Sequence, residues 1–141
     1  MRPGPVRVLC VDDNRLLADA MERRINFDPK LDWAGWVEHA GDAVCRIREA
    51  RPDVVLLDID MPGKDCFAIV RDVSLEVPDV KIVMFSGYIR PEYIDRAVEA
   101  GAWGYLSKNE EMDEVVSAIL RVAGGEFVLS PEVQSTRVPE A

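Results

Sequence analysis

The residues best suited to chemistry in this sequence are carboxylates that follow short apolar runs. Residues 54–57 read Val-Val-Leu-Leu, and Asp58 follows them directly, shortly before the turn-forming pair Pro62-Gly63. A short apolar run of this kind is typical of a strand buried on both faces of a parallel sheet. Ligands of such open sheets bind beyond the carboxyl ends of the strands. Asp58 is therefore a candidate reactive group.

Three further apolar runs also end in polar residues. The run Val6–Val11 leads into Asp12-Asp13, the run Val80–Phe85 into Ser86, and the run Trp103–Leu106 into Ser107-Lys108. Each group also has an ordinary interpretation, since Asp caps helices and forms turns, and Ser and Lys are common on solvated loops. Because four different strands deliver them, three acids, a hydroxyl and an ammonium group are expected to meet at one edge of the sheet.

The elements that would position these groups alternate along the chain. A second strand is expected at residues 31–37, and helical periodicity appears at residues 14–26, 40–50, 64–73, 90–100 and 111–124. This alternation predicts an α/β fold, doubly wound as (βα)5, with a parallel five-stranded sheet of order 2-1-3-4-5. Its switch point lies between the first and third strands, where Asp12, Asp13 and Asp58 would meet.

The composition is that of one globular domain. Of 141 residues, 30% are charged and 48% apolar, which is ordinary globular usage. The net charge of -9 argues against binding of nucleic acid or of an anionic membrane by this chain itself. No apolar stretch approaches the ~20 residues of a membrane span, and the N-terminus lacks a secretory signal, so a cytoplasmic location is expected. The cysteines lack metal-ligand spacing, and Cys10 and Cys45 are expected in the core.

The strand-end residues together resemble the receiver domain of two-component response regulators, which has a CheY-like, flavodoxin-like fold. The likeness extends from about Val6 to Gly124. It implies a phosphoprotein in which Asp58 accepts a phosphoryl group from a sensor histidine kinase. It also implies a bound Mg²⁺, or Mn²⁺ in its place, with Asp13 and Asp58 as direct ligands. Asp12 would bind the ion mainly through water, and Asp60 would bind it through its backbone carbonyl.

The same resemblance implies roles for three more residues. Ser86 would bond a phosphoryl oxygen, and Lys108 would pair with the phosphoryl group. Tyr105, three residues before Lys108, matches the aromatic switch residue of the family, whose ring changes orientation together with Ser86. Such a chain catalyses the phosphorylation and dephosphorylation of its own aspartate, so no conventional enzymatic turnover is expected. The family also suggests a homodimer that forms on phosphorylation.

Electrostatics explains why such a site needs cations. A carboxylate repels a charged phosphoryl group, and two unit charges ~5 Å apart at an effective dielectric constant of 20 cost about 3 kcal/mol. Oxygen ligands are those that Mg²⁺ prefers, and this ion commonly binds one or two carboxylates together with phosphate oxygens. The metal and Lys108 would neutralise the charge that develops on the transferring group.

Some positions limit how far the resemblance applies. Asn109 follows Lys108 where many receivers have a proline with a cis bond, so the isomer of this bond is left open. Cys66 stands where the family often has glycine. Asp60 and Tyr88 lie two residues beyond the phosphoacceptor and the hydroxyl, and we expect them to tune the lifetime of the phosphoryl group.

An output surface is expected near the fifth strand. Side chains alternate along a strand, so Trp103 and Tyr105 should share one face. Together with the nearby Tyr88 they form a candidate partner surface, since exposed aromatic residues often anchor interfaces. The alternative is that Trp103 packs beneath helix side chains.

The chain is expected to divide into a receiver domain, residues 1–124, and a C-terminal tail or start of an interdomain linker, residues 125–141. Residues 126–133 read Glu-Phe-Val-Leu-Ser-Pro-Glu-Val and resemble the junction that follows the receiver in LuxR-type (NarL/FixJ) regulators of transcription. Only 16 residues follow Gly125, too few for a helix-turn-helix output domain. The output is therefore either such a domain, absent from this chain, or a separate downstream protein. A frayed terminus is the plain alternative for the tail.

Two other functions compete with this interpretation. Asp58-Ile59-Asp60 followed by Ser86 and Lys108 loosely resembles the haloacid-dehalogenase phosphatases, but their remaining acidic pair follows the lysine, whereas Asp12-Asp13 comes first here. The other is a receiver-like interaction module that works without phosphorylation. The complete set of site residues argues against it.

Overall fold

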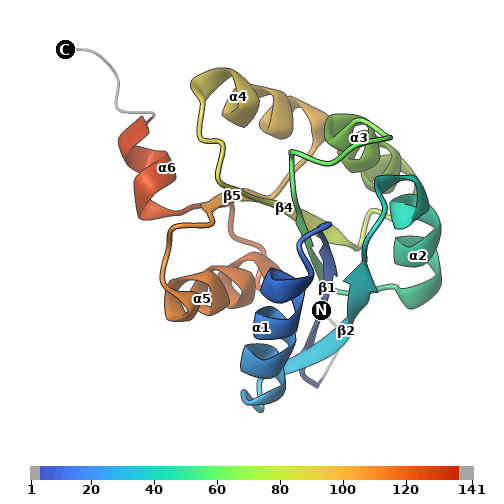
Figure 1. Cartoon of the computed structure of the whole chain (residues 1–141), viewed down its shortest axis with the longest axis vertical. Coiled ribbons are helices and arrows are strands. Elements are labelled where there is room, and N and C mark those ends of the chain that lie inside the picture. Colours follow the sequence, from blue (N-terminus) through green and yellow to red (C-terminus); the bar gives the residue numbers. More distant parts are fainter. Residues whose placement is uncertain (1–3, 137–141) are drawn as a thin grey trace.

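The computed structural model describes residues 4–136 and contains a single parallel sheet with helices on both faces (Figure 1). The strands are β1 Val6–Val11, β2 Leu31–Val37, β3 Val54–Leu57, β4 Lys81–Ser86, β5 Gly104–Ser107 and β6 Val128–Leu129. The helices are α1 Arg15–Asn26, α2 Ala43–Ala50, α3 Cys66–Glu76, α4 Pro91–Ala100, α5 Met112–Ala123 and α6 Pro131–Thr136, with a 3₁₀ turn, η1, at Ala40–Asp42.

The sheet has the order β2-β1-β3-β4-β5-β6. The predicted fold class and the order of the first five strands are therefore confirmed. The sixth strand was not predicted, because the region from residue 125 was expected to be a tail or linker. It forms because Val128 donates its N–H to the carbonyl of Trp103 (3.1 Å) and Ser130 donates to that of Tyr105 (3.1 Å). A strand of two residues is too short to show periodicity in the sequence.

Two apolar cores lie on the two faces of the sheet. Helices α1 and α5 cover one face, and α2, α3 and α4 cover the other (Figure 1). All four residues of β3 are buried, as expected for a central strand of a parallel sheet. Helix α6 packs on the α4 side through Val133, which is fully buried.

Trp103 lies on the other face of the sheet from Tyr105, so the predicted shared face is wrong. Trp103 is half-buried and packs against the core beneath α1 and α5, with the Lys81 ammonium 5.1 Å from the centre of its ring. Tyr105 belongs to the core beneath α2, α3 and α4. The prediction failed because β5 begins at Gly104, and strict alternation of faces holds only inside a regular strand.

Cys45 also differs from expectation. It is exposed on α2, whereas Cys10 and Cys66 are buried. Residues 43 and 47 are the buried positions of this helix. Cys45, two residues after the first of them, therefore points away from the sheet.

A bulge in β2 changes the direction of its tryptophans. Val8 of β1 pairs with Trp33 and Leu9 pairs with Gly35, so Ala34 is an extra residue. Gly35 has a φ of +136°, a conformation that glycine adopts far more readily than other residues. Beyond the bulge, Trp36 pairs with Cys10. Trp33 and Trp36 consequently lie on the same face of the sheet, although they are three residues apart.

Candidate functional site

The predicted acids, hydroxyl and ammonium group lie at the carboxyl ends of four neighbouring strands. Asp12 follows β1, Asp58 follows β3, Ser86 ends β4, and Lys108 follows β5. Asp12 is 1% exposed, Asp58 5% and Ser86 0%, while Lys108 is half-buried. The structure thus brings together groups that are far apart in the sequence, as the predicted topology required.

Three carboxylates form a cluster at this edge. Asp12, Asp13 and Asp58 each offer an oxygen atom, and these three atoms lie within 4.8 Å of one another. Asn14 donates its N–H to Oδ1 of Asp12 (2.9 Å), and its own side chain caps α1 by accepting the N–H of Leu17 (3.1 Å). The helix start therefore fixes the turn that carries Asp12 and Asp13.

Lys108 compensates only part of the negative charge. Its Nζ lies 2.8 Å from Oδ2 of Asp12 and 3.4 Å from Oδ1 of Asp58. The short contact to Asp12 is an ion pair without hydrogen-bond geometry, since this buried Oδ2 has no hydrogen-bond partner within the part of the chain that the structure describes. Three carboxylates and one ammonium leave an excess of negative charge. All-oxygen donors, an incompletely paired buried oxygen and this excess fit a hard divalent cation.

The pKa values reflect the crowding. Burial raises the pKa of Asp58, and the charge of Asp12 raises it further, while Lys108 acts in the opposite direction. Burial alone would lower the pKa of Lys108, but its close contact with Asp12 and the charges of Asp12 and Asp58 outweigh burial and raise that pKa. Lys108 therefore stays protonated at neutral pH, and the ionised form of Asp58 is held at an energetic cost.

Ser86 and Tyr105 meet at the backbone of Tyr88. Ser86 Oγ accepts the N–H of Tyr88 (2.9 Å), and the Tyr105 hydroxyl donates to the Tyr88 carbonyl. Burial raises the pKa of Tyr105, with its hydrogen bond to Ser86 acting in the other direction, so the phenol stays a donor. The structure thus joins the two predicted switch residues through the start of the β4–α4 loop.

The remaining predicted residues have less enclosed positions. Asp60 is exposed, and its backbone acts to lower the pKa of Asp58. Coordination of a metal by the Asp60 carbonyl stays a prediction. The side chain of Tyr88 is 49% exposed. Of the predicted partner surface, Tyr88 is accessible, Trp103 is half-buried and Tyr105 is buried. No peptide bond within residues 4–136 is cis, so the bond between Lys108 and Asn109 is trans.

Two features near the site were not predicted. The Trp36 indole N–H donates to the backbone carbonyl of Asp12 (2.6 Å). The sequence Trp-Ala-Gly-Trp at residues 33–36 was the available signal for this contact. It could not be interpreted from the sequence, because the direction of Trp36 depends on the bulge. The second feature is that Glu132 of α6 accepts the hydroxyl of Ser107 (2.7 Å), the residue before Lys108. No sequence pattern pointed to this contact.

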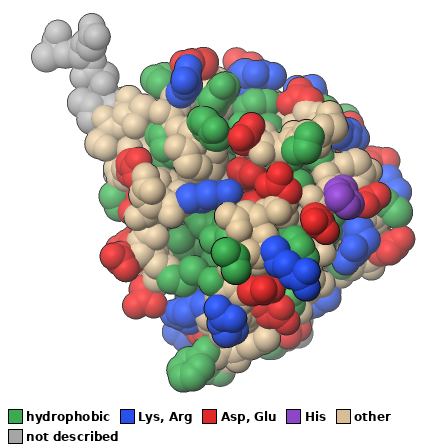
Figure 2. Space-filling view, in the orientation of Figure 1, with side chains coloured by type: hydrophobic (Ala, Val, Ile, Leu, Met, Phe, Trp, Pro, Cys, Tyr) green, Lys and Arg blue, Asp and Glu red, His purple; other side chains and the backbone are tan. Residues whose placement is uncertain are grey.

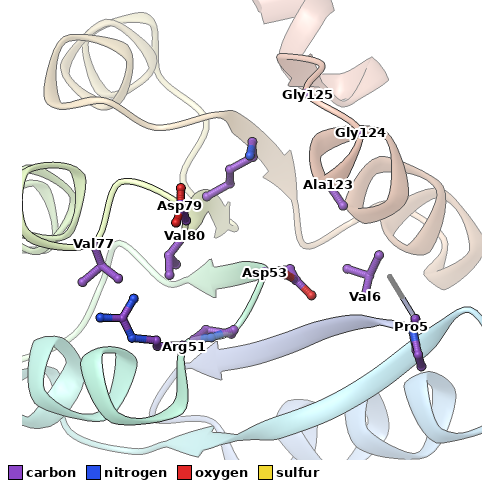
Figure 3. A pocket seen from close by; sticks show the side chains of 13 residues that line it. Pro5, Val6, Arg51, Asp53, Val77, Asp79, Val80, Ala123, Gly124 and Gly125 are labelled. Atoms are coloured by element: carbon purple, nitrogen blue, oxygen red, sulfur yellow. The ribbon is translucent and has the colours of Figure 1, made fainter. Parts of the chain in front are cut away.

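A hollow of about 500 Å³ lies at the opposite edge of the sheet from Asp12, Asp13 and Asp58. Figure 3 shows residues from the amino ends of the strands and from the end of α5 around it, among them Val6, Asp53 and Gly124. Because strand-end chemistry in open α/β sheets belongs to the carboxyl edge, this hollow is separate from the candidate site.

Comparison with known proteins supports the family suggested by this geometry. The family model for the response regulator receiver domain matches residues 8–120. The chain belongs to this family. It is 29% identical over 136 residues to the transcriptional regulatory protein DesR of Bacillus subtilis, covering 96% of this chain and 67% of DesR. It is 32% identical over 128 residues to the response regulator GacA of Pseudomonas aeruginosa, covering 91% of this chain and 60% of GacA.

A solved structure gives the same result. The receiver-family chain is similar to a LuxR-family two-component response regulator from Aurantimonas sp. SI85-9A1, with a TM-score of 0.87, 27% identity and 94% of each chain covered. Its first curated relatives are longer, since the chain spans 57% to 67% of their length. None of the helices within residues 4–136 is long and apolar enough to cross a membrane.

Proposed function

We propose that Asp58 of this receiver domain accepts a phosphoryl group from a sensor histidine kinase in a Mg²⁺-dependent reaction, and that phosphorylation changes an output surface through Ser86 and Tyr105. The observation that carries the proposal is the meeting of Asp12, Asp13 and Asp58 within 4.8 Å, with Lys108 in contact with two of them. This arrangement has the charges and the oxygen ligands that phosphoryl transfer to a carboxylate requires.

Each residue has a defined role in this proposal. Asp12, Asp13 and Asp58 would hold Mg²⁺, with the carbonyl of Asp60 as a further ligand; the ion would supply positive charge beside the phosphoryl oxygens. A carboxylate oxygen of Asp58 attacks the phosphorus, the bond from phosphorus to the histidine nitrogen of the kinase breaks, and that nitrogen keeps the electron pair. Lys108 exchanges its contact with Asp58 for one with the phosphoryl group, and the Ser86 hydroxyl donates to a phosphoryl oxygen. Asp60 and Tyr88 border the group and tune its lifetime.

The switch follows from the shared contact at Tyr88. Ser86 Oγ accepts from the N–H of Tyr88 and the Tyr105 hydroxyl donates to its carbonyl. When Ser86 turns to bond a phosphoryl oxygen, the β4–α4 loop and the Tyr105 ring must adjust together. This is the step by which the surface around Tyr88, the accessible aromatic residue there, would respond.

The output is part of the proposal as well. DesR and two further curated relatives are named transcriptional regulatory proteins and are longer than this chain. We infer that this receiver controls transcription through an output domain outside the present chain or through a protein partner, in the cytoplasm. The net charge of -9 disfavours binding of nucleic acid by the receiver itself. On the face seen in Figure 2, acidic and basic side chains are interspersed.

The test is the intact mass after brief incubation with acetyl phosphate, in Mg²⁺ and in EDTA. We expect the wild type to gain one phosphoryl group in Mg²⁺ only, and Asp58→Asn to gain none. Asp79→Asn is the matched control, because Asp79 is an exposed acid beside the hollow at the other edge of the sheet. No gain under any condition would favour the phosphorylation-independent module, and sustained hydrolysis of a phosphate monoester would favour the phosphatase.

A further inference from the structure

The segment after α5 is joined by hydrogen bonds to the loop that carries Lys108. We call residues 126–136 the C-terminal segment and residues 107–110 the Lys108 loop. The Ser107 hydroxyl donates to Oε2 of Glu132 (2.7 Å), and the side-chain amide of Asn109 donates to Oε1 of the same residue (3.4 Å). One glutamate of the segment thus binds the residues on both sides of Lys108.

The backbone of the loop is held as well. Asn109 donates its N–H to Ser107 Oγ (3.0 Å), and Ser107 donates its N–H to Ser130 Oγ (3.1 Å). In return, Glu132 donates its N–H to Oε2 of Glu110 (2.9 Å). Ser107 is 0% exposed and Ser130 5%, and buried hydrogen bonds of this kind are costly to leave unmade. The conformation of the loop and the position of α6 therefore depend on each other.

The strand β6 attaches the segment at a second place. A Cβ atom added at Gly104 would lie 2.7 Å from the carbonyl oxygen of Val128, a backbone atom that cannot turn away. The close approach of β5 and β6 therefore requires glycine at residue 104. Figure 1 shows α6 beyond β5, between α4 and α5, at the end of the sheet farthest from β2.

We propose that the C-terminal segment positions the Lys108 loop, so that the docking of this segment and the phosphorylation of Asp58 are coupled. The proposal rests on the proposed function. Lys108 is the cation that must leave Asp58 for the incoming phosphoryl group, and its reach is set by Ser107 and Asn109. Glu132 touches neither the phosphoryl group nor the carboxylates, so it is a positioning residue that acts through the loop.

Two variants release the segment in different ways. Glu132→Ala removes both acceptors, while Glu132→Gln keeps one of them. Gly104→Ala pushes β6 from β5 and leaves every residue of the Lys108 loop unchanged. The matched control is Glu126→Ala, because Glu126 is a glutamate of the same segment whose carboxylate pairs with Arg121 of α5 (2.6 Å) and not with the loop. Circular dichroism and thermal unfolding establish that each variant is folded.

The first measurement is the rate of phosphorylation of the full chain by acetyl phosphate, followed by intact mass over a range of Mg²⁺ concentrations. In this reaction a carboxylate oxygen of Asp58 forms the new bond to phosphorus, the bond from phosphorus to the acetate oxygen breaks, and acetate leaves with the electron pair. We expect Glu132→Ala and Gly104→Ala to lower the maximal rate about tenfold, the scale of losing an outer partner of a site residue. The half-saturating Mg²⁺ concentration should not change in these variants. The maximal rate of Glu132→Gln should lie between those of the wild type and Glu132→Ala, and the maximal rate of Glu126→Ala should match that of the wild type.

The second measurement is hydrogen exchange of the wild-type segment before and after phosphorylation. Equilibrium coupling is reciprocal, so a docked segment that favours the phosphorylated state is itself docked more firmly in that state. Exchange of the Val128 and Ser130 amides, which donate to the carbonyls of Trp103 and Tyr105, should slow about fivefold. Asp58→Asn should show no such change.

The inference would be overturned if the phosphorylation rates of Glu132→Ala and Glu132→Gln were both within twofold of the wild-type rate. It would also be overturned if hydrogen exchange of the segment did not change when the wild type is phosphorylated. A fall in rate accompanied by a higher half-saturating Mg²⁺ concentration would also overturn it, because the damage would then lie in the carboxylate cluster. A wild-type chain that is never phosphorylated would instead overturn the proposed function, so the two failures are distinguishable.

Discussion

At the scale of a single residue, the reaction and the surroundings of Asp58 favour different protonation states of its carboxyl group. It must be ionised to attack phosphorus, yet it is 5% exposed and lies beside Asp12 and Asp13. Burial and the charge of Asp12 raise its pKa against the effect of Lys108. An ionised carboxylate in such a position opposes folding, because the folded state binds the proton more tightly than the unfolded state does.

Replacing this carboxylate should therefore stabilise the protein when no metal is bound. Since the pKa of Asp58 is raised in the folded state from its usual 3.8, stability is lost as the pH rises from below 3.8 through the raised pKa, and the loss is complete above it. We expect Asp58→Asn to have the higher midpoint of thermal unfolding at pH 7 in EDTA, by a few degrees, the scale of about 1 kcal/mol in a domain of this size.

The pH dependence provides the check on this prediction. The advantage of Asp58→Asn should disappear as the pH falls below 3.8, where the wild-type carboxyl is protonated in both states. Asp79→Asn, an exposed acid, serves as the control and should change the midpoint little at either pH. A lower midpoint for Asp58→Asn at pH 7 would mean that the ion pair with Lys108 outweighs burial.

The residue types of the site were predictable because strand ends are visible in the sequence. Asp12, Asp58, Ser86 and Lys108 each follow an apolar run, and the topology of a parallel sheet collects such ends at one edge. Contacts that depend on side-chain reach were not predictable in this way. The bond from Ser107 to Glu132 joins residues 25 positions apart, and neither residue stands in a pattern that indicates the other.

At the scale of elements, departures from regular geometry caused the remaining differences. Strand β6 has two residues, and Trp103 precedes the regular part of β5. The bulge at Ala34 in β2 is a third case, because it reverses the faces of the residues that follow. Period-2 reasoning gives the correct face only where pairing is uninterrupted. The predicted range of β2, residues 31–37, is confirmed, but the faces on which its side chains lie could not be predicted from the sequence because of the bulge.

The bulge has a consequence for the carboxylate cluster. It aims Trp36 so that the indole N–H donates to the Asp12 carbonyl at 2.6 Å, and Asp12 is adjacent to Asp13. Trp36→Phe keeps an aromatic ring but removes the donor. A hydrogen bond of this kind contributes about 1 kcal/mol, so we expect affinity for Mg²⁺ to fall roughly fivefold. The measurement is a calorimetric titration of the protein with Mg²⁺.

Trp33→Phe is the matched control, because Trp33 lies on the same strand and face but packs against the core. It should leave the affinity for Mg²⁺ unchanged. Equal affinities for the wild type and Trp36→Phe would show that the backbone hydrogen bonds of the turn, such as the one from Asp12 N–H to the Val37 carbonyl (3.1 Å), hold Asp12 in place unaided.

At the scale of the whole molecule, repulsion between negative charges opposes the folded state. The chain has a net charge of -9. Three of its carboxylates meet at one edge of the sheet, and the Lys108 ammonium contacts two of them. Repulsion within a compact protein opposes folding. A divalent cation bound at this edge would relieve that repulsion where it is greatest, whereas monovalent salt screens the exposed charges at a distance.

Mg²⁺ should therefore stabilise the whole fold by mass action. A ligand that binds only the folded state adds about 2.7 kcal/mol at a concentration of 100 times its dissociation constant. We expect the midpoint of thermal unfolding to rise steadily with MgCl₂ at constant ionic strength, and to stay level when NaCl replaces it. Asp13→Asn should remove most of the rise, since Asp13 is an exposed member of the cluster whose loss leaves the core intact. An equal rise in NaCl would mean that general screening, and not a bound ion, balances the acidic edge.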